Sequence, residues 1–164
     1  MTEETVTTTE IEHARRDWVS EHLGTYLKSG GAQGHVVDLR EIGGHRFTPT
    51  LLLQTAGRKS GKTHVTPLIY GTLGGEVVIV ASKGGADVHP AWYLNIKDSS
   101  EVPFQIATQA FRASWREPDG DERTALWAFM EKVYPPYKDY QRATGRKIPV
   151  VILRASEEIA VFRP

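Results

Sequence analysis

The sequence predicts a mainly β protein of the α+β class, folded as a split β-barrel of about six or seven mostly antiparallel strands, with an N-terminal helix and two further helices. Short β-branched runs, separated by glycine-containing turns, follow one another from residue 36 to residue 81 and resume after residue 101. Tight turns join neighbouring runs, as antiparallel hairpins require. Closing such a sheet into a barrel protects its edges, so a barrel is favoured over an open sheet.

The chain of 164 residues fits a single domain, which we place at 10–164 after a disordered polar start at 1–9. The absence of cysteine excludes disulfides, thiolate zinc sites and cysteine nucleophiles. Twenty Lys and Arg balance twenty Asp and Glu, so the basic surplus of a nucleic-acid-binding protein is missing. The polar, acidic start and the lack of a long apolar run predict a cytoplasmic protein.

The first element expected is an amphipathic helix from about residue 11 to residue 27. Its apolar side chains recur at spacings of three and four, and charged residues occupy the opposite face. The simplest interpretation packs this helix on the domain. The alternative is a lid or a helix in peripheral contact with the inner face of a membrane.

The strands follow in order, and Gly74-Gly75 forms a two-residue hairpin turn between two of them. In the run 109–115, Phe111, Ala113 and Trp115 alternate with polar residues, which predicts one buried face. The expected strands are 36–39, 50–55, 65–72, 76–81, 102–107, 109–115 and 149–154.

Two helices interrupt the strands. The first covers residues 89–96 and has Pro90 near its start, where proline is favoured. The second covers Glu122 to Tyr134 and ends at Pro135-Pro136.

A basic turn, residues 55–62, is the sharpest local signal. The segment Gly57-Arg58-Lys59-Ser60-Gly61-Lys62 combines three cations and a hydroxyl between two strands. Its glycines are too close together for the phosphate loop of nucleotide hydrolases, and a strand follows it where that loop requires a helix. From the residues alone, an anion site and a solvated hairpin tip are equally good interpretations.

Two further segments could form a ligand site. Residues 80–86 leave a strand through small residues that would let a flat ligand approach the backbone, although a plain connection explains them as well. Tyr134, Tyr137 and Tyr140 lie beyond a helix end, where they could bind a ligand or only pack a loop against the barrel. The histidines lack metal-ligand spacing, and we expect no metal site.

Five segments taken together resemble the deazaflavin-dependent nitroreductase family, in order from about Leu51 to Leu153. That family has a split β-barrel fold and uses coenzyme F420, an 8-hydroxy-5-deazaflavin with a phosphodiester and an oligoglutamate tail. The segments are Gly57-Arg58-Lys59-Ser60-Gly61, Pro67-Leu68, Val80-Ala81-Ser82-Lys83-Gly84-Gly85, Pro90-Ala91-Trp92-Tyr93-Leu94-Asn95 and Tyr134-Pro135-Pro136-Tyr137-Lys138-Asp139-Tyr140.

The resemblance implies a cofactor site in two parts. The phosphate and tail would lie on the basic turn, and the ring would lie beside the segment 80–84 and the helix 89–96. His64, Thr66 and Ile69 stand where an Arg, an Asn and an aromatic residue are common in the family. The cofactor-binding residues implied are Arg58, Lys59, Ser60, Gly61, His64, Thr66, Pro67, Val80, Ala81, Ser82, Lys83, Gly84, Trp92 and Asn95.

The resemblance also implies hydride transfer from reduced F420 to a small-molecule acceptor, either a menaquinone-like quinone or a nitroaromatic or nitroimidazole compound. Ser82 and Tyr134 are the candidate catalytic residues, and Trp92, Tyr134, Tyr137 and Tyr140 are the candidate substrate-binding residues. The alternatives are an FMN-binding oxidoreductase with the same barrel and a non-catalytic carrier of a deazaflavin or a lipid. A monomer and a homodimer are both compatible with the sequence.

Overall fold

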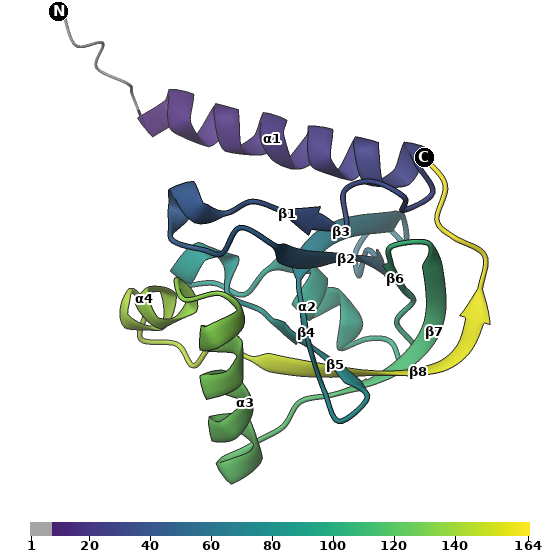
Figure 1. Ribbon diagram of the computed structural model, residues 1–164. Helices are drawn as coiled ribbons and strands as arrows, with labels where there is room; N and C mark the ends of the chain where they lie inside the picture. Colours follow the sequence, from purple (N-terminus) through teal and green to yellow (C-terminus); the bar gives the residue numbers. More distant parts are fainter. Residues whose placement is uncertain (1–7) are drawn as a thin grey trace, which may run out of the picture.

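The computed structural model describes residues 8–164 and consists of a curled antiparallel sheet with helices packed around it (Figure 1). The strands follow the order β1-β2-β6-β7-β8-β5-β4, and β3 pairs with β2. The expected split-barrel class is confirmed. The strands are β1 (Val36–Val37), β2 (Thr48–Ala56), β3 (Thr63–Ile69), β4 (Gly71–Leu73), β5 (Glu76–Val80), β6 (Phe104–Ile106), β7 (Gln109–Arg116) and β8 (Val150–Ile159).

The sheet has eight strands, one more than the upper expectation, because the expected strand 65–72 is two strands. Its first part, β3, pairs with β2 from Thr50↔Ile69 to Ala56↔Thr63. Tyr70 interrupts the run, and β4 then turns at Gly74-Gly75 to pair with β5. The long β2–β3 hairpin therefore carries the basic turn at its tip.

Strand β5 is buried on both faces, which explains its unbroken apolar sequence. Val77 and Ile79 point into the barrel core with Leu51, Leu53 and Phe104. The alternate residues, Val78 and Val80, pack in a second core with Leu126, Met130 and Tyr137. This second core holds the C-terminal helices against the outside of the sheet, and these helices bring the tyrosines to the barrel.

The described helices are α1 (Thr8–Lys28), α2 (Ala91–Ile96), α3 (Gly120–Val133) and α4 (Tyr137–Arg142), with short 3-10 turns η1 (Arg40–Ile42) and η2 (Lys83–Gly85). The sequence predicts that residues 1–9 are disordered. Residues 1–7 lie outside the described residues, whereas Thr8 and Thr9 belong to α1, so the prediction is wrong for these two. Helix α4 corrects the sequence prediction, which treated the tyrosine segment as a loop. The two prolines end α3, but the φ of −60° at Pro136 also suits the start of a new helix.

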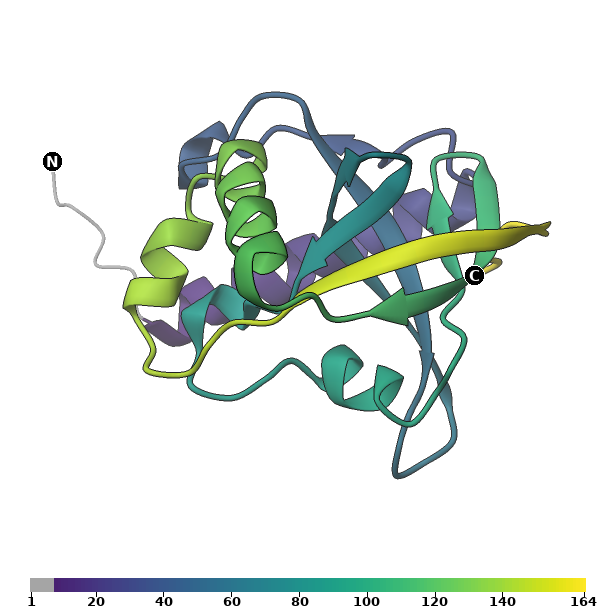
Figure 2. The same ribbon diagram turned by 90° about the horizontal axis from the view of Figure 1, so that it is seen from below.

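Helix α1 lies across one side of the sheet, and α3 and α4 lie together at another (Figures 1 and 2). Tyr26 anchors α1: its buried hydroxyl donates to the Thr50 carbonyl (3.0 Å) and accepts from the Ala107 N–H (2.8 Å). Burial raises the pKa of this hydroxyl to about 12. No described helix is long and apolar enough to cross a membrane.

Candidate functional site

The basic turn between β2 and β3 is closed by its own backbone. The Gly57 N–H donates to the Lys62 carbonyl, and the Gly61 N–H donates back to the Gly57 carbonyl, both at 2.8 Å. A Cβ at Gly57 would come within 2.7 Å of the Ser60 hydroxyl and 2.9 Å of the His64 ring, so any other residue would have to displace these side chains. The turn thus brings the Ser60 and His64 side chains close to Gly57.

Asn95 of α2 fixes this turn from the side. Its buried carbonyl oxygen accepts from the Arg58 backbone N–H and from the Arg58 guanidinium, both at 3.2 Å. Its amide N–H donates to the Thr55 hydroxyl (3.3 Å). Asn95 therefore orients Arg58. It lies at the basic turn, whereas the sequence prediction grouped it with the residues expected to line the ring.

A cavity of about 250 Å³ opens beside the turn, and we call it the basic cavity. Arg58 and Lys59 are exposed there, and neither forms an ion pair within the described part of the chain. Their positive charge is available to an anion. The basic cavity is lined by Thr55, Gly57, Arg58, Lys59, Ser60, His64, Thr66, Ala91, Trp92 and Asn95.

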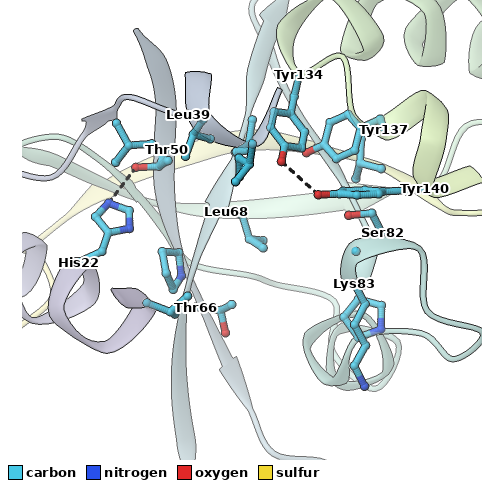
Figure 3. A pocket seen from close by; sticks show the side chains of 18 of the residues that line it. His22, Leu39, Thr50, Thr66, Leu68, Ser82, Lys83, Tyr134, Tyr137 and Tyr140 are labelled. Carbon is cyan, nitrogen blue, oxygen red and sulfur yellow. Dashed lines mark hydrogen bonds between the residues drawn. The ribbon is translucent and has the colours of Figure 1, made fainter. Parts of the chain in front are cut away.

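A second cavity, of about 400 Å³, lies between the barrel, α1 and α4, and we call it the apolar cavity (Figure 3). Thr66 and Trp92 line both cavities, so the two lie next to each other at these residues. Leu39 and Leu68 contribute aliphatic wall, and Ser82 and the three tyrosines contribute hydroxyls. The predicted residues that line it are Thr66, Pro67, Val80, Ser82, Lys83, Gly84, Trp92, Tyr134, Tyr137 and Tyr140.

The three tyrosines form one cluster at the end of α3 and on α4 (Figure 3). The Tyr134 and Tyr140 hydroxyls lie 3.1 Å apart, and the Tyr137 ring packs edge-on to both neighbouring rings. Burial raises the pKa of the Tyr137 hydroxyl, and the neighbouring phenols raise it further, so this group stays protonated at neutral pH. The cluster offers hydrogen-bond donors in an apolar wall.

Helix α4 is held against η2, which carries the segment expected to face a cofactor ring. Gly85 makes this packing tight, because it has a φ of +84° and a Cβ there would come within 2.8 Å of the Tyr140 carbonyl oxygen. Substitution of Gly85 would therefore disturb both sides of the cavity.

Two predicted residues line neither cavity. Ala81 is completely buried, and its N–H donates to the Pro149 carbonyl. Gly61 lies on the exposed tip of the turn, with its N–H bonded to Gly57. Each has a structural place next to the site, and neither contributes a wall.

Comparisons with known proteins point to one family. The family model described as F420H(2)-dependent quinone reductase matches residues 18–155. The chain belongs to this family. An F420H(2)-dependent quinone reductase from Mycobacterium tuberculosis (strain ATCC 25618 / H37Rv) is 32% identical over 148 residues, covering 83% of this chain and 95% of the relative.

Two solved structures support the assignment to the F420H2-dependent quinone reductase family. An F420-H2 dependent reductase (FDR-A) is 40% identical, with a TM-score of 0.60 over 65% of this chain and 94% of its own. A structure described as a domain-swapped dimer is 37% identical, with a TM-score of 0.62 over 85% and 99%. Members of this family are oxidoreductases with coenzyme F420 as cofactor, which confirms the enzyme class and cofactor that the resemblance implied.

The residues present fit the cofactor of the F420H2-dependent quinone reductases. An anionic phosphodiester and tail require cations free of carboxylate partners, and the basic cavity has Arg58 and Lys59. A flat ring requires an apolar slot, and the neighbouring cavity has Trp92, Pro67 and the small residue Gly84. The two cavities are neighbours that share Thr66 and Trp92 in their walls.

Several residues of the site in this F420H2-dependent quinone reductase family member were not predicted from the sequence. Trp18, Val19 and His22 of α1 line the apolar cavity, as do Leu39 and Thr50. The periodicity of α1 indicates that one side of this helix packs on the domain, but it does not show which part of the barrel the helix covers. Arg146 was also missed: it lines neither cavity, but it bonds to the segment 81–86.

Proposed function

We propose that this chain binds coenzyme F420 with its anionic part in the basic cavity and its ring in the apolar cavity, and reduces a quinone such as menaquinone beside the tyrosine cluster. The observation that carries this proposal is that the two cavities are neighbours with Thr66 and Trp92 in both walls. When bound in its reduced form, the cofactor supplies a hydride for a two-electron reduction. The protein then has to orient the acceptor and supply hydrogen-bond donors to it.

Ser82 and Tyr134 are the proposed catalytic residues. Both line the apolar cavity, and Figure 3 shows both on the side of the three tyrosines. Negative charge develops on an acceptor oxygen when a hydride arrives, and a hydroxyl aimed at that oxygen stabilises it. Tyr140 supports Tyr134 through the contact between their hydroxyls. In this proposal the Tyr134 hydroxyl acts as a hydrogen-bond donor to the acceptor.

The walls favour a quinone over a nitro compound. Leu39, Leu68 and the Tyr137 ring offer a mostly aliphatic and aromatic surface, which suits a flat, apolar naphthoquinone. Nitroaromatic and nitroimidazole compounds are polar, and we place them as incidental acceptors in the same cavity.

A lipid-soluble quinone would enter past the N-terminal helix. Trp18 and Val19 of α1 and Ile42 of η1 line the apolar cavity, although 47%, 42% and 55% of their surfaces are exposed. They therefore lie at its rim. We place this rim against the surface of a bilayer, and expect vesicles to retain the protein and to lose it when Trp18 and Val19 are both replaced by Asp.

Of the two oligomeric states compatible with the sequence, we favour the homodimer, because one solved relative is a domain-swapped dimer. Analytical ultracentrifugation tests this part. A single species of monomer mass at micromolar concentration would reject it.

Titration of the purified protein with F420 and with FMN, followed by fluorescence, tests the cofactor. We expect binding of F420 at micromolar concentration or below, and weaker binding of FMN. Tight FMN binding without F420 binding would instead support the FMN oxidoreductase. Oxidation of F420H2 by menadione separates the enzyme from a carrier, which would bind the cofactor without turnover for any acceptor.

A further inference from the structure

Arg146 lies between α4 and β8 and donates hydrogen bonds to one loop from several atoms. Its guanidinium bonds to the carbonyl oxygens of Ser82 (2.8 Å), Ala86 (2.7 Å) and Ala81 (3.3 Å). The same group reaches His89 Nδ1 at 3.0 Å. One side chain therefore holds residues on both sides of η2, about sixty positions earlier in the chain.

The loop that Arg146 holds has an unfavourable backbone conformation. Lys83, Gly84 and Gly85 all have positive φ, of +46°, +65° and +84°. Lys83 has a side chain, and such a residue rarely adopts this conformation unless its surroundings impose it. Inside η2 only the weak ladder of a short 3-10 turn is present, with the Gly85 N–H bonded to Ser82 and the Ala86 N–H bonded to Lys83.

We propose that Arg146 is a positioning residue for cofactor binding: it holds Ser82, Lys83 and Gly84 in the conformation in which they face the deazaflavin ring. The inference rests on the proposed function, since these three residues line the cavity assigned to the ring. Arg146 itself lines neither cavity, so it acts only through the loop.

Other contacts join the same two segments, so the fold does not depend on Arg146 alone. The Thr144 hydroxyl donates to the Asp87 carboxylate (2.7 Å), and Gly85 packs against Tyr140. Loss of the guanidinium should therefore leave α4 attached and release mainly the carbonyl groups of the loop. This distinguishes positioning from general stabilisation.

The chain offers a matched control in Arg123. It is also half-buried, and its guanidinium donates to a backbone carbonyl, that of Ile148, at 2.6 Å. It has no hydrogen bond to the segment 81–86. Replacement of Arg123 by Gln removes one guanidinium–carbonyl hydrogen bond and a cation–π contact with Trp127, and it leaves the four contacts of Arg146 with the loop and His89 in place.

The test is F420 affinity, measured by fluorescence titration, together with the melting temperature of each variant. We expect Arg146→Gln to weaken F420 binding about ten- to a hundredfold, the usual cost of losing a group that orients binding residues. Arg123→Gln should lower the melting temperature and leave the affinity unchanged. Arg146→Lys keeps the charge but cannot span three carbonyls, so it should fold and still bind F420 weakly. In Arg146→Ala, millimolar guanidinium should restore affinity, and equal concentrations of sodium chloride or urea should not.

Parental F420 affinity in Arg146→Lys and Arg146→Gln would overturn the inference, and equal loss of affinity in Arg123→Gln would reduce Arg146 to a structural residue. A parent protein that binds no F420 would instead reject the proposed function. Should Arg146→Gln fail to fold, the Lys variant and the guanidinium rescue decide the question.

Discussion

At the scale of single residues, the Tyr134 hydroxyl is the most direct test of the proposed chemistry. Replacement by Phe keeps the ring in its buried place and removes the group that contacts Tyr140. We expect kcat with a quinone to fall by roughly ten- to a thousandfold, because one donor to a developing oxyanion contributes about 1.5–4 kcal/mol. F420 affinity should barely change.

Tyr70→Phe is the control for this change. Tyr70 is also buried, and its hydroxyl contacts a histidine, His35 (2.7 Å), but it lines neither cavity. If Tyr134→Phe turns over at the parental rate while both variants melt several degrees lower, the Tyr134 hydroxyl is structural.

Substitutions at the basic turn should weaken F420 binding to different degrees. Arg58→Ala should weaken F420 binding by about ten- to a hundredfold, the loss of one charge-assisted contact. Asn95→Ala should weaken it less, because Asn95 acts on Arg58 and leaves the charge in place. Lys62→Ala should have the smallest effect, since Lys62 lies outside the cavity wall. Equal affinity in Arg58→Ala and the parent would make the turn an ordinary solvated hairpin tip.

His89 should make the stability of the loop depend on pH. A guanidinium only donates, so its contact with His89 Nδ1 requires the neutral ring. Burial, Arg146 and Lys97 lower the pKa of His89, and Glu117 opposes them. The stabilisation is therefore complete above the usual value of 6.5 and is lost as the pH falls from there through the lower pKa of the folded state.

Thermal melting from about pH 7.5 to about pH 5 checks this, with His89→Gln as the comparison. The Gln variant retains an acceptor that does not titrate, so its melting temperature should fall less on acidification. His89 also packs on the Tyr93 ring, so the two proteins are compared by their pH slopes and not by their absolute stability. If the melting temperatures of the two proteins depend on pH in the same way, His89 is not the titrating group.

At the scale of elements, the contact between η2 and α4 joins the two sides of the apolar cavity. Gly85→Ala should destabilise the protein by about 1–3 kcal/mol, because alanine is strained at this φ and its Cβ meets the Tyr140 backbone. Turnover should fall as well, since Tyr140 would be displaced from the apolar cavity. Gly145→Ala, which meets nothing within 4 Å, is the control and should be nearly neutral in urea unfolding.

The strands from β1 to β5 were predictable because they are mostly β-branched runs separated by glycine turns, and β5 keeps an apolar sequence because it is buried on both faces. Strand β7 was predictable because its apolar residues alternate with polar ones. Helix α4 was not, because Pro135-Pro136 ends a helix and six residues rich in tyrosine show no helical period. The split of 65–72 at Tyr70 was also hidden, since strand residues continue on both sides of it.

The candidate site was predictable where its residues share a short segment, as in the basic turn. It was not predictable where distant segments meet. No pattern in the sequence shows that Arg146 bonds to carbonyls near residue 82, or that Asn95 reaches back to Arg58. Such contacts depend on how α2 and the segment before β8 pack against the barrel.

At the scale of the whole molecule, the fold places two different surfaces side by side. The β2–β3 hairpin provides the cations, and η2, α1 and the α3–α4 pair enclose the apolar cavity next to it. The formal net charge of the chain is zero, so attraction of an anionic cofactor depends on the local arrangement and not on the total charge.

We propose that one cofactor spans both cavities and passes a hydride to an acceptor held by the tyrosines. Single-turnover oxidation of protein-bound F420H2 by a menaquinone analogue, followed by the return of deazaflavin fluorescence, tests it most directly. We expect fast oxidation by the parent protein and slow oxidation by Tyr134→Phe at saturating cofactor. Arg58→Ala should reach the parental rate once F420H2 is raised to saturation. Absence of oxidation in the parent protein with bound F420H2 and any quinone would contradict it.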